Sequence, residues 1–328
     1  MQTRRLLLVS LVSAATLGIV ADASAQAYPS RTVTMVVPFA AGGPGDTLAR
    51  VLAERMKVSL GQTIIVENVT GAAGAIGVGR VARAEPDGYT IGLGFLGTHV
   101  LNGAVYKLQY DLLKDFEPIA LLANNPHLIV AKNALPANNL KELIAWLKTN
   151  PDKASQGTGG LGTPSHVGGA FFQSITGTRF QFVHYRGGAG PAMQDLMGEH
   201  IDLMVDQALN SLPHLRDGNI KVYAVMDKAR LASAPDIPTV DEAGLPGLYV
   251  SSWYGLWAPN GAPKEVLAKL NAAVVDALGD PTVRKRLANL GLETPPHGQQ
   301  TPEALGAFQK AEIERWWPII KAAGIKAE

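Results

Sequence analysis

The chain has 328 residues, of which 47% are hydrophobic and 17% charged, which is ordinary for a globular protein with room for a large core or two domains. Removal of residues 1–25 takes away two of the 29 basic and one of the 28 acidic residues, so the remaining chain has no net charge and no global field to draw nucleic acid or an anionic membrane. The absence of cysteine excludes disulfides, thiolate metal sites, a cysteine nucleophile and a lipid anchor on cysteine.

The N-terminus has the pattern of an export signal. Two arginines precede an apolar stretch over residues 6–20, which is short for a membrane span, and a small-residue cleavage motif ends at Ala25. We therefore expect residues 1–25 to be a signal peptide of the general secretory route, cut after Ala25 or Ala27, and the mature protein to lie in the periplasm. An N-terminal anchor helix is the alternative.

The first part of the chain alternates between β-branched apolar runs and helical periodicity. Strands are predicted over residues 33–37, 63–68 and 89–93, and helices over residues 47–59 and 71–84. This strand–helix–strand–helix–strand order predicts a parallel sheet.

The same alternation returns in the middle of the chain, and a helical tail follows it. Strands are predicted over residues 127–131, 180–183, 201–205 and 220–225, and helices over residues 140–149, 165–176, 191–197, 264–278, 281–290 and 302–323. The sequence thus contains two α/β units, and a crevice between two such units is a preferred ligand position.

Each unit has one glycine-rich turn between a strand and a helix. The first turn runs from Phe39 to Asp46. Amides at the start of a helix have no intrahelical partner and carry the positive end of the helix dipole, so this turn can hold an anion without lysine or arginine. The alternative is a turn that only closes the α/β unit, with Asp46 or Thr47 as the helix cap.

The second turn, residues 156–166, follows the same logic. Pro164 suits the first helical position, and Thr163 either caps the helix or turns its hydroxyl to a ligand. His166 either donates to a carboxylate or packs within its helix. Two such turns facing each other suit a molecule with two anionic ends.

Three charged residues near strand ends keep two interpretations each. Arg186 follows a strand and opens a helix, and a solvated charge is favoured over a ligand cation. Asp202 and Asp206 flank an apolar strand, where a carboxylate either binds a ligand group or caps the next helix.

Enzyme signatures are weak. Residues 92–97 fit GxGxxG but follow the third strand of their unit and precede a poor helix start, so no cofactor is expected. No GxSxG or phosphate-binding GxxxxGK[ST] motif occurs, and the seven histidines lack metal-ligand spacing. An exported hydrolase using Ser165, His166 and Asp46 is the competing hypothesis, although adjacent Ser and His on one helix point in different directions.

Taken together, the motifs resemble those of the Bug family of periplasmic solute-binding proteins, the receptors of tripartite tricarboxylate transporters. The resemblance runs from Tyr28 nearly to the C-terminus. It is carried by VPFAAGGPGD, NVTGAAGAIG, EPDGYT, YDLLKDFEPIALLANNP, GLGTPSH, YRGGAGPAMQDLMG, IPTVDEAGLPG and WYGLWAPNGAP.

The resemblance implies a type II periplasmic binding protein, or Venus-flytrap, fold with two α/β lobes joined by two crossing strands. Lobe one is then residues 28–126 with 252–328, and lobe two is residues 127–251. It also implies a monomeric receptor rather than an enzyme, with no metal or cofactor. Such a receptor captures a small carboxylate, typically a di- or tricarboxylate, an acidic amino acid or an aromatic acid, and presents it to a membrane transporter or a sensor protein.

The candidate ligand-binding residues are Phe39, Ala40, Ala41, Gly42, Gly43, Asp46, Thr98, His99, Gly162, Thr163, Ser165, His166, Tyr185, Asp206 and Gln207. The chain departs from the family pattern at His184 and Arg186, where the family often has proline and lysine around a tyrosine, and at Gln207, where asparagine is frequent. A larger, less charged pocket would suit an aromatic dicarboxylate such as terephthalate.

Overall fold

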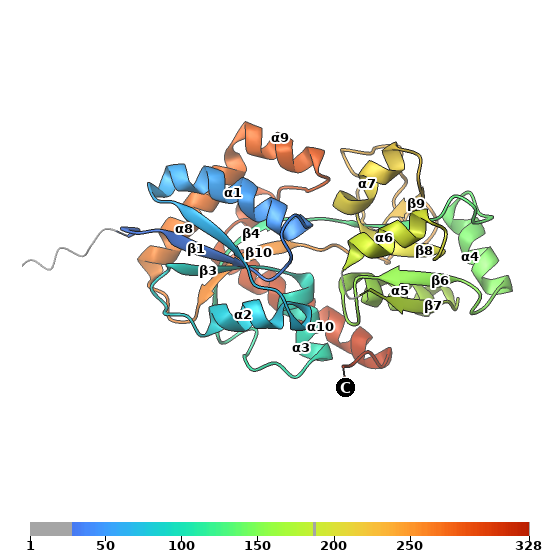
Figure 1. Cartoon of the computed structure of the whole chain (residues 1–328), viewed down its shortest axis with the longest axis horizontal. Helices are drawn as coiled ribbons and strands as arrows, with labels where there is room; N and C mark the ends of the chain where they lie inside the picture. Colours follow the sequence, from blue (N-terminus) through green and yellow to red (C-terminus); the bar gives the residue numbers. More distant parts are fainter. Residues whose placement is uncertain (1–27, 186–187, 328) are drawn as a thin grey trace, which may run out of the picture.

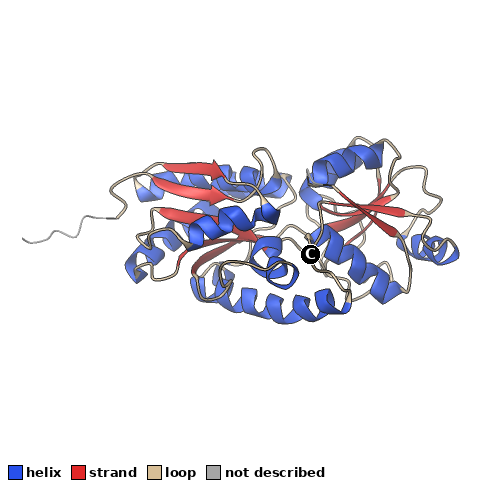
Figure 2. Ribbon diagram, turned by 60° about the horizontal axis from the view of Figure 1, so that its bottom comes forward, coloured by secondary structure: helices blue, strands red, loops and turns tan. Residues whose placement is uncertain are grey.

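The computed structural model describes residues 28–185 and 188–327 (Figure 1). The predicted signal peptide, its cleavage sites after Ala25 or Ala27, and Arg186 lie outside the described residues. The described strands form two five-stranded sheets, each covered by helices on both faces (Figure 2). The expected fold of two α/β lobes is therefore confirmed.

The first sheet has the strand order β2–β1–β3–β10–β4, and the second has the order β7–β6–β8–β5–β9. The strands are β1 (Val33–Val37), β2 (Ile64–Asn68), β3 (Thr90–Phe95), β4 (Phe116–Ala123), β5 (His127–Ala131), β6 (Ser155–Thr158), β7 (Gln181–His184), β8 (Leu203–Gln207), β9 (Lys221–Val225) and β10 (Tyr254–Pro259).

The helices follow most of the predicted ranges closely. They are α1 (Pro44–Leu60), α2 (Ala75–Ala82), α3 (Asn102–Val105), α4 (Leu140–Thr149), α5 (Pro164–Thr176), α6 (Ala189–Met197), α7 (Ala208–Arg216), α8 (Lys264–Gly279), α9 (Pro281–Asn289) and α10 (Pro302–Ala322), with short helical turns η1 (Ala72–Gly74), η2 (Gly97–Leu101) and η3 (His297–Gln299). Within the described ranges, no helix is both long enough and apolar enough to span a membrane.

Helix ends follow local chemistry. Helices α1 and α5 each begin with a proline, Pro44 and Pro164, whose missing N–H costs nothing at that position. Each ends at a glycine in the left-handed conformation, Gly61 at φ 68° and Gly177 at φ 64°. These signals are local, which is why the sequence predicts both helices well.

The prediction of a parallel sheet is confirmed for the three strands of the first unit, and both sheets also contain antiparallel strands. Strands β1, β2 and β3 are parallel, but β10 pairs antiparallel with both β3 and β4. In the second sheet, β6, β7 and β8 are parallel, whereas β5 pairs antiparallel with β8 and β9. The alternation of strands and helices predicts only how elements that follow one another along the chain are arranged. Strand β10 returns from far along the sequence and was not predicted, nor were β4, β6, η2, α3 and α7.

Two extended segments cross between the sheets side by side. The His127 amide donates to the Val250 carbonyl, and the Ser252 amide donates to the Asn125 carbonyl, both at 2.9 Å. Pro126 and Ser251 form an antiparallel bridge between the same segments. The lobes are therefore joined by paired backbone.

The long helix α10 contacts both lobes. Gln309 donates to the carbonyl of His99 in the first lobe at 2.9 Å. Farther along the helix, the Trp316 ring lies 5.9 Å from Phe171 of α5, and Arg315 donates to the Tyr249 carbonyl at 2.6 Å. Helix α10 thus packs against the first lobe with its earlier turns and against the second lobe with its later turns.

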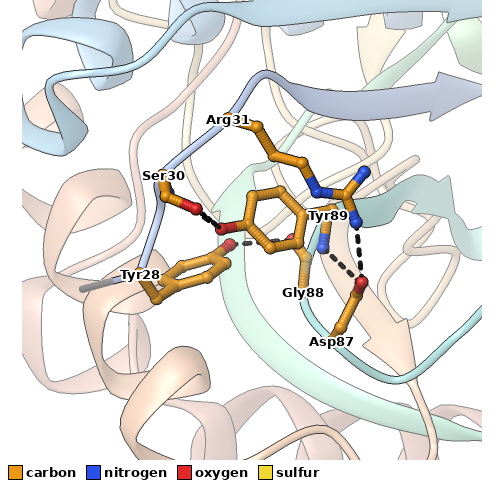
Figure 3. A network of polar contacts seen from close by, with 6 residues as sticks. All are labelled: Tyr28, Ser30, Arg31, Asp87, Gly88 and Tyr89. Carbon is orange, nitrogen blue, oxygen red and sulfur yellow. Dashed lines mark hydrogen bonds and ion pairs between the residues drawn. The ribbon is translucent and has the colours of Figure 1, made fainter. Parts of the chain in front are cut away.

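The start of the described chain is fastened to the first sheet (Figure 3). The Tyr28 hydroxyl donates to the Gly88 carbonyl at 2.8 Å, and the Arg31 guanidinium pairs with Asp87 at 2.9 Å while lying 4.0 Å from the centre of the Tyr89 ring. These three contacts hold the N-terminal residues beside the start of β3, at the edge of the sheet opposite the first glycine-rich turn.

Candidate ligand-binding site

The first turn is braced by Asp46, which is only 3% exposed. One carboxylate oxygen accepts from the Gly42 amide at 2.8 Å and from Arg50 Nε at 2.9 Å, and the other accepts from Asn68 Nδ2 at 2.9 Å. Burial alone would raise the pKa of Asp46, but the hydrogen bonds from Arg50, Gly42 and Asn68 outweigh it and lower that pKa. Both oxygens are therefore committed to holding the turn.

The cap of α1 differs from both predicted candidates. Gly43 occupies the cap position, and neither Asp46 nor Thr47 caps the helix, because α1 already begins at Pro44. The preceding residues Ala40 and Ala41 are exposed, and their amides have no hydrogen-bond partner in the described part of the chain. The turn thus presents free N–H donors beside a helix N-terminus, which is favourable for an anion.

A second loop at the same edge of the sheet was not among the predicted site residues. It follows β2 and contains four consecutive residues with positive φ, from Gly71 at 120° to Gly74 at 89°. Ala72 and Ala73 between them have φ 47° and 52°, a conformation that costs a non-glycine residue on the order of 1 kcal/mol. Asn102 Nδ2 holds this loop by donating to the Ala73 carbonyl at 2.9 Å. The run Gly-Ala-Ala-Gly is the signal that could have identified it.

Thr98 and His99 lie in the core rather than on a surface that a ligand could reach. The Thr98 hydroxyl is within hydrogen-bond distance of the Phe95 backbone and of His99 Nδ1 at 3.0 Å. The His99 ring stacks on Trp257 at 3.9 Å, and burial lowers the pKa of His99 to about 3. Both side chains are thus part of the core of the first lobe.

Side chains of the second turn bond back to its own backbone. The Gly159 amide donates to Ser165 Oγ at 2.9 Å, and Thr163 Oγ1 donates to the Gly160 carbonyl at 2.7 Å. Thr163 sits at the cap position of α5, but its side chain does not cap the helix amides. Thr163 thus has the predicted cap position without a capping hydrogen bond from its side chain, and contact of its hydroxyl with a ligand stays a prediction.

His166 is packed beneath the second turn and neutral. Its Nδ1 accepts from the Gly162 amide at 3.1 Å, and its ring meets Phe182 and His184 edge-on, each at 4.6 Å. Burial, followed by the neighbouring His184, lowers the pKa of His166 to about 4. A neutral ring with Nδ1 as acceptor carries its proton on Nε2.

The hydrolase geometry is missing in the described residues. Ser165 Oγ contacts Gly159 and Thr163, whereas His166 Nδ1 contacts Gly162, so no serine–histidine hydrogen bond forms. Asp46 belongs to the other lobe and is fully engaged there. A nucleophile needs a base within hydrogen-bond reach, and this arrangement provides none.

The GxGxxG match also has a packing explanation. Gly92 and Gly94 lie within β3 instead of a strand-to-helix turn. A Cβ atom on Gly94 would lie 2.0 Å from His99 Nδ1, and one on Gly92 would lie 2.8 Å from Val81. These glycines make room for neighbouring side chains.

Tyr185 lies beside the second turn, and Asp206 lies under α7. The Tyr185 hydroxyl donates to Asp195 at 2.6 Å, and burial together with Asp195 raises the pKa of Tyr185 to about 12. Asp206 accepts from Ser211 and Asn210, both at 2.7 Å, and burial raises its pKa to about 6 despite these bonds. Asp206 therefore fastens the first turns of α7.

Gln207 links the second lobe to the aromatic residues of the first. Its Oε1 accepts from Asn125 Nδ2 at 2.7 Å and from the Tyr254 hydroxyl at 2.9 Å. Tyr254 stacks with Phe95 at 6.0 Å, and Phe95 meets Phe39 of the first turn edge-on at 4.9 Å. Asn125, Tyr254 and Phe95 were not predicted as site residues, and the only signal was that each lies at the end of a strand or in a crossing segment.

No group of three or more histidine, aspartate or glutamate side chains in residues 28–185 and 188–327 is arranged to hold a metal ion. The described turns instead offer backbone amides and neutral side chains. Such a surface can bind an anionic or polar ligand.

Comparison with known proteins finds relatives that match most of the chain. The family model described as tripartite tricarboxylate transporter family receptor matches residues 48–325. The chain is 40% identical to the UPF0065 protein in the TAR-I ttuE-ttuC' intergenic region of Agrobacterium vitis, over 96% of this chain and 90% of that protein. It is 33% identical to Protein BugT of Bordetella pertussis, over 99% of both chains.

Solved structures are similar along most of the chain. The periplasmic binding protein BugD superposes with a TM-score of 0.83 at 43% identity, covering 92% of this chain and 100% of that one. MatC of Rhodopseudomonas palustris with bound malate gives 0.82 at 41% identity, covering 89% and 100%. A second R. palustris protein, with adipate, gives 0.84 at 34% identity, covering 92% and 100%.

Proposed function

The chain belongs to the tripartite tricarboxylate transporter receptor family and is a periplasmic solute-binding receptor, and we propose that it captures a small dicarboxylate and presents it to a membrane transporter of that type. The ligand enters between the lobes, the two glycine-rich turns engage its two ends, and the lobes close around it. Closure requires a ligand that contacts both lobes, because a ligand bound equally well by both states shifts nothing. A sensor protein is the alternative partner.

In this proposal, lobe one comprises residues 28–126 and 252–328, and lobe two comprises residues 127–251. The division falls at the paired crossing segments, where the Ser252 amide donates to the Asn125 carbonyl. The hinge would lie there, because few residues have to change their backbone angles for one lobe to move against the other.

The observation that carries the proposal is that the first turn has amides without a partner, while its carboxylate is already paired. Its carboxylate, Asp46, is paired with the Arg50 guanidinium and accepts a hydrogen bond from Asn68, while the amides of the exposed residues Ala40 and Ala41 have no partner in the described residues. A carboxylate ligand would therefore meet N–H donors and a helix N-terminus without a competing negative charge. The two acids present in similar structures, malate and adipate, are both dicarboxylates.

The finer identity of the ligand is part of the proposal. The half-buried Phe39 and Phe95 form an edge-to-face pair beside the first turn, and this apolar surface would suit the carbon skeleton of a longer or aromatic diacid. We propose a dicarboxylate with an apolar middle, for which terephthalate and adipate are the test compounds.

A thermal-shift series on residues 26–328 tests this. We expect a saturable rise in melting temperature with malate, succinate, adipate or terephthalate, since a ligand that binds only the folded state stabilises it. The monomethyl ester of the best diacid is the matched control and should lose most of the effect. A rise equally large with the monoester would contradict engagement of both ends, and turnover of any ester would contradict a receptor role.

A further inference from the structure

A tyrosine of the first lobe reaches the second turn of the other. Tyr106 follows α3, and its hydroxyl donates to the Leu161 carbonyl at 2.9 Å. Next to it, Val105 packs against Gly162 so closely that a Cβ atom there would lie 2.7 Å from Val105 Cγ1. We infer that Tyr106 and Val105 form an interlobe latch that holds the second turn against the first lobe before any ligand binds. This inference rests on the proposed receptor function and assigns a regulatory contact to the same site.

The latch holds one peptide group from both sides. The carbonyl of the Leu161–Gly162 peptide accepts from Tyr106 of the first lobe, and its N–H donates to His166 Nδ1 of the second. Because the peptide is planar, fixing both of these groups fixes the orientation of the whole unit. Tyr106 is thus a positioning residue for the second turn, supplied by the opposite lobe.

The first lobe holds the latch residues firmly. The Tyr106 amide donates to the Asn102 carbonyl, and the Val105 carbonyl accepts from the Ala327 amide, both at 2.9 Å. Trp317 of α10 donates to the Val100 carbonyl just before α3, also at 2.9 Å. The C-terminal segment therefore braces α3, so that a movement of the second turn away from the first lobe breaks the Tyr106 bond rather than distorting α3.

The crossing segments provide a different kind of interlobe contact. There the Tyr254 hydroxyl donates to Gln207, and Tyr254 is fully buried, whereas Tyr106 is only partly buried. The described crossing residues also hold three buried polar atoms without a partner, His127 Nδ1, Ser251 Oγ and Ser252 Oγ. Lobe opening would keep the contact near the crossing and release the latch.

A distance measurement in solution tests the latch. The chain has no cysteine, so Val58→Cys on α1 and Lys148→Cys on α4, both exposed, give one specific pair of spin labels. We expect two interlobe distances in the protein without ligand, and an about fivefold fall in the closed-to-open ratio with Tyr106→Phe, as for the loss of one ordinary hydrogen bond. Tyr110→Phe is the matched control, since the Tyr110 hydroxyl is buried without a partner and its removal should leave the ratio unchanged.

A second pair of variants separates lobe contact from backbone strain. Gly162→Ala should move the population to the open distance, and addition of Val105→Ala should restore part of the closed population by removing the clash. Identical distance distributions in wild type and Tyr106→Phe would overturn the latch. If Tyr106→Phe changes the ratio but malate, adipate and terephthalate change it in neither protein, the latch stands and the proposed dicarboxylate ligand fails.

Discussion

The two glycine-rich turns are held in place by different chemistry. The first turn is braced by a buried carboxylate with three strong donors, all within its own lobe. The second is braced by neutral groups, Ser165 and His166, and by Tyr106 from the other lobe. In the proposed receptor, the first turn is the preformed half of the ligand site, whereas the second half depends on protonation state and on lobe position. In a receptor with one fixed and one adjustable turn, ligand binding can change the position of the adjustable turn and thereby the arrangement of the lobes.

The largest expected effect comes from placing negative charge in the preformed half. Gly43 has ordinary backbone angles, and a Cβ atom there would meet no atom closer than 3.4 Å, so a side chain fits without strain. We expect Gly43→Glu to weaken diacid binding about a hundredfold, because like charges brought together cost several kcal/mol. Isothermal titration with the best diacid measures this.

Gly43→Gln is the control, since it has nearly the same size without the charge and should retain most of the affinity. Gly162→Glu should weaken binding at least as much as Gly43→Glu, but at this position even Gly162→Ala is expected to weaken it, because of φ 72° and the contact with Val105. Equal losses in Gly43→Glu and Gly43→Gln would show that bulk, not charge, is responsible.

Asp46 of the first turn should contribute more to the free energy of unfolding than Ser165 of the second turn. Asp46→Ala leaves the donors of Gly42, Asn68 and Arg50 without their acceptor, and we expect a loss of about 3 kcal/mol in the free energy of unfolding. Ser165→Ala should cost about 1 kcal/mol, the value of an ordinary neutral hydrogen bond. Urea denaturation gives both values.

The exposed Glu54→Ala serves as the reference for these two substitutions and should change stability by less than about 0.5 kcal/mol, because Glu54 pairs with Lys57 only at the surface. Similar costs for Asp46→Ala and Ser165→Ala would remove the distinction between a charged and a neutral brace.

Acidification should loosen the second turn before the first. Burial lowers the pKa of His166 to about 4, so between pH 6.5 and 4 the unfolded chain takes up a proton that the folded chain does not. Stability that is fully present above pH 6.5 is therefore lost as the pH falls toward 4, by about 2 kcal/mol for His166 at pH 4.5. His99 and His127, both with pKa lowered by burial to about 3, act in the same direction, while Asp206, with a pKa of about 6, opposes them.

Urea denaturation at pH 7 and pH 4.5 measures whether acidification lowers the free energy of unfolding and whether His166 is responsible. The His166→Gln variant should lose part of the pH dependence, since glutamine can accept from Gly162 without titrating in this range. Asp46→Ala should keep the full dependence, because the lowered pKa of Asp46 confines its titration to lower pH. A variant His166→Gln with the wild-type pH profile would place the titration elsewhere.

The smallest effect concerns neighbouring glycines of the first turn. Gly42 has φ 80° with open space around it, so Gly42→Ala should cost about 1 kcal/mol through backbone conformation alone. Gly43→Ala should be neutral or stabilising by about 0.5 kcal/mol, since its backbone is already acceptable for alanine. Paired thermal melts compare the two, and a larger cost at Gly43 would contradict the described turn.

Much of the local structure could be read from the residues. Strands β1 and β5 and helix α4 lie at their predicted bounds, and both glycine-rich turns fall between a strand and a helix as expected. Periodicity, proline at helix starts and glycine at helix ends act over a few residues, so the sequence states them directly. The expected placement of Phe39 and Gly42 on the first turn, and of Gly162 on the second, follows from the same signals.

The sequence by itself determined the two α/β units, their glycine-rich turns and the lack of cysteine and of net charge after residue 25. Only the tertiary structure decided that β10 enters the first sheet antiparallel, that Asp46 binds Asn68, and that Tyr106 reaches Leu161. These partners are separated by many residues, and the choice among all possible acceptors depends on how whole elements pack. No local pattern encodes that choice, which is why neither the burial of His99 nor the contact of Tyr106 with the second turn could be predicted.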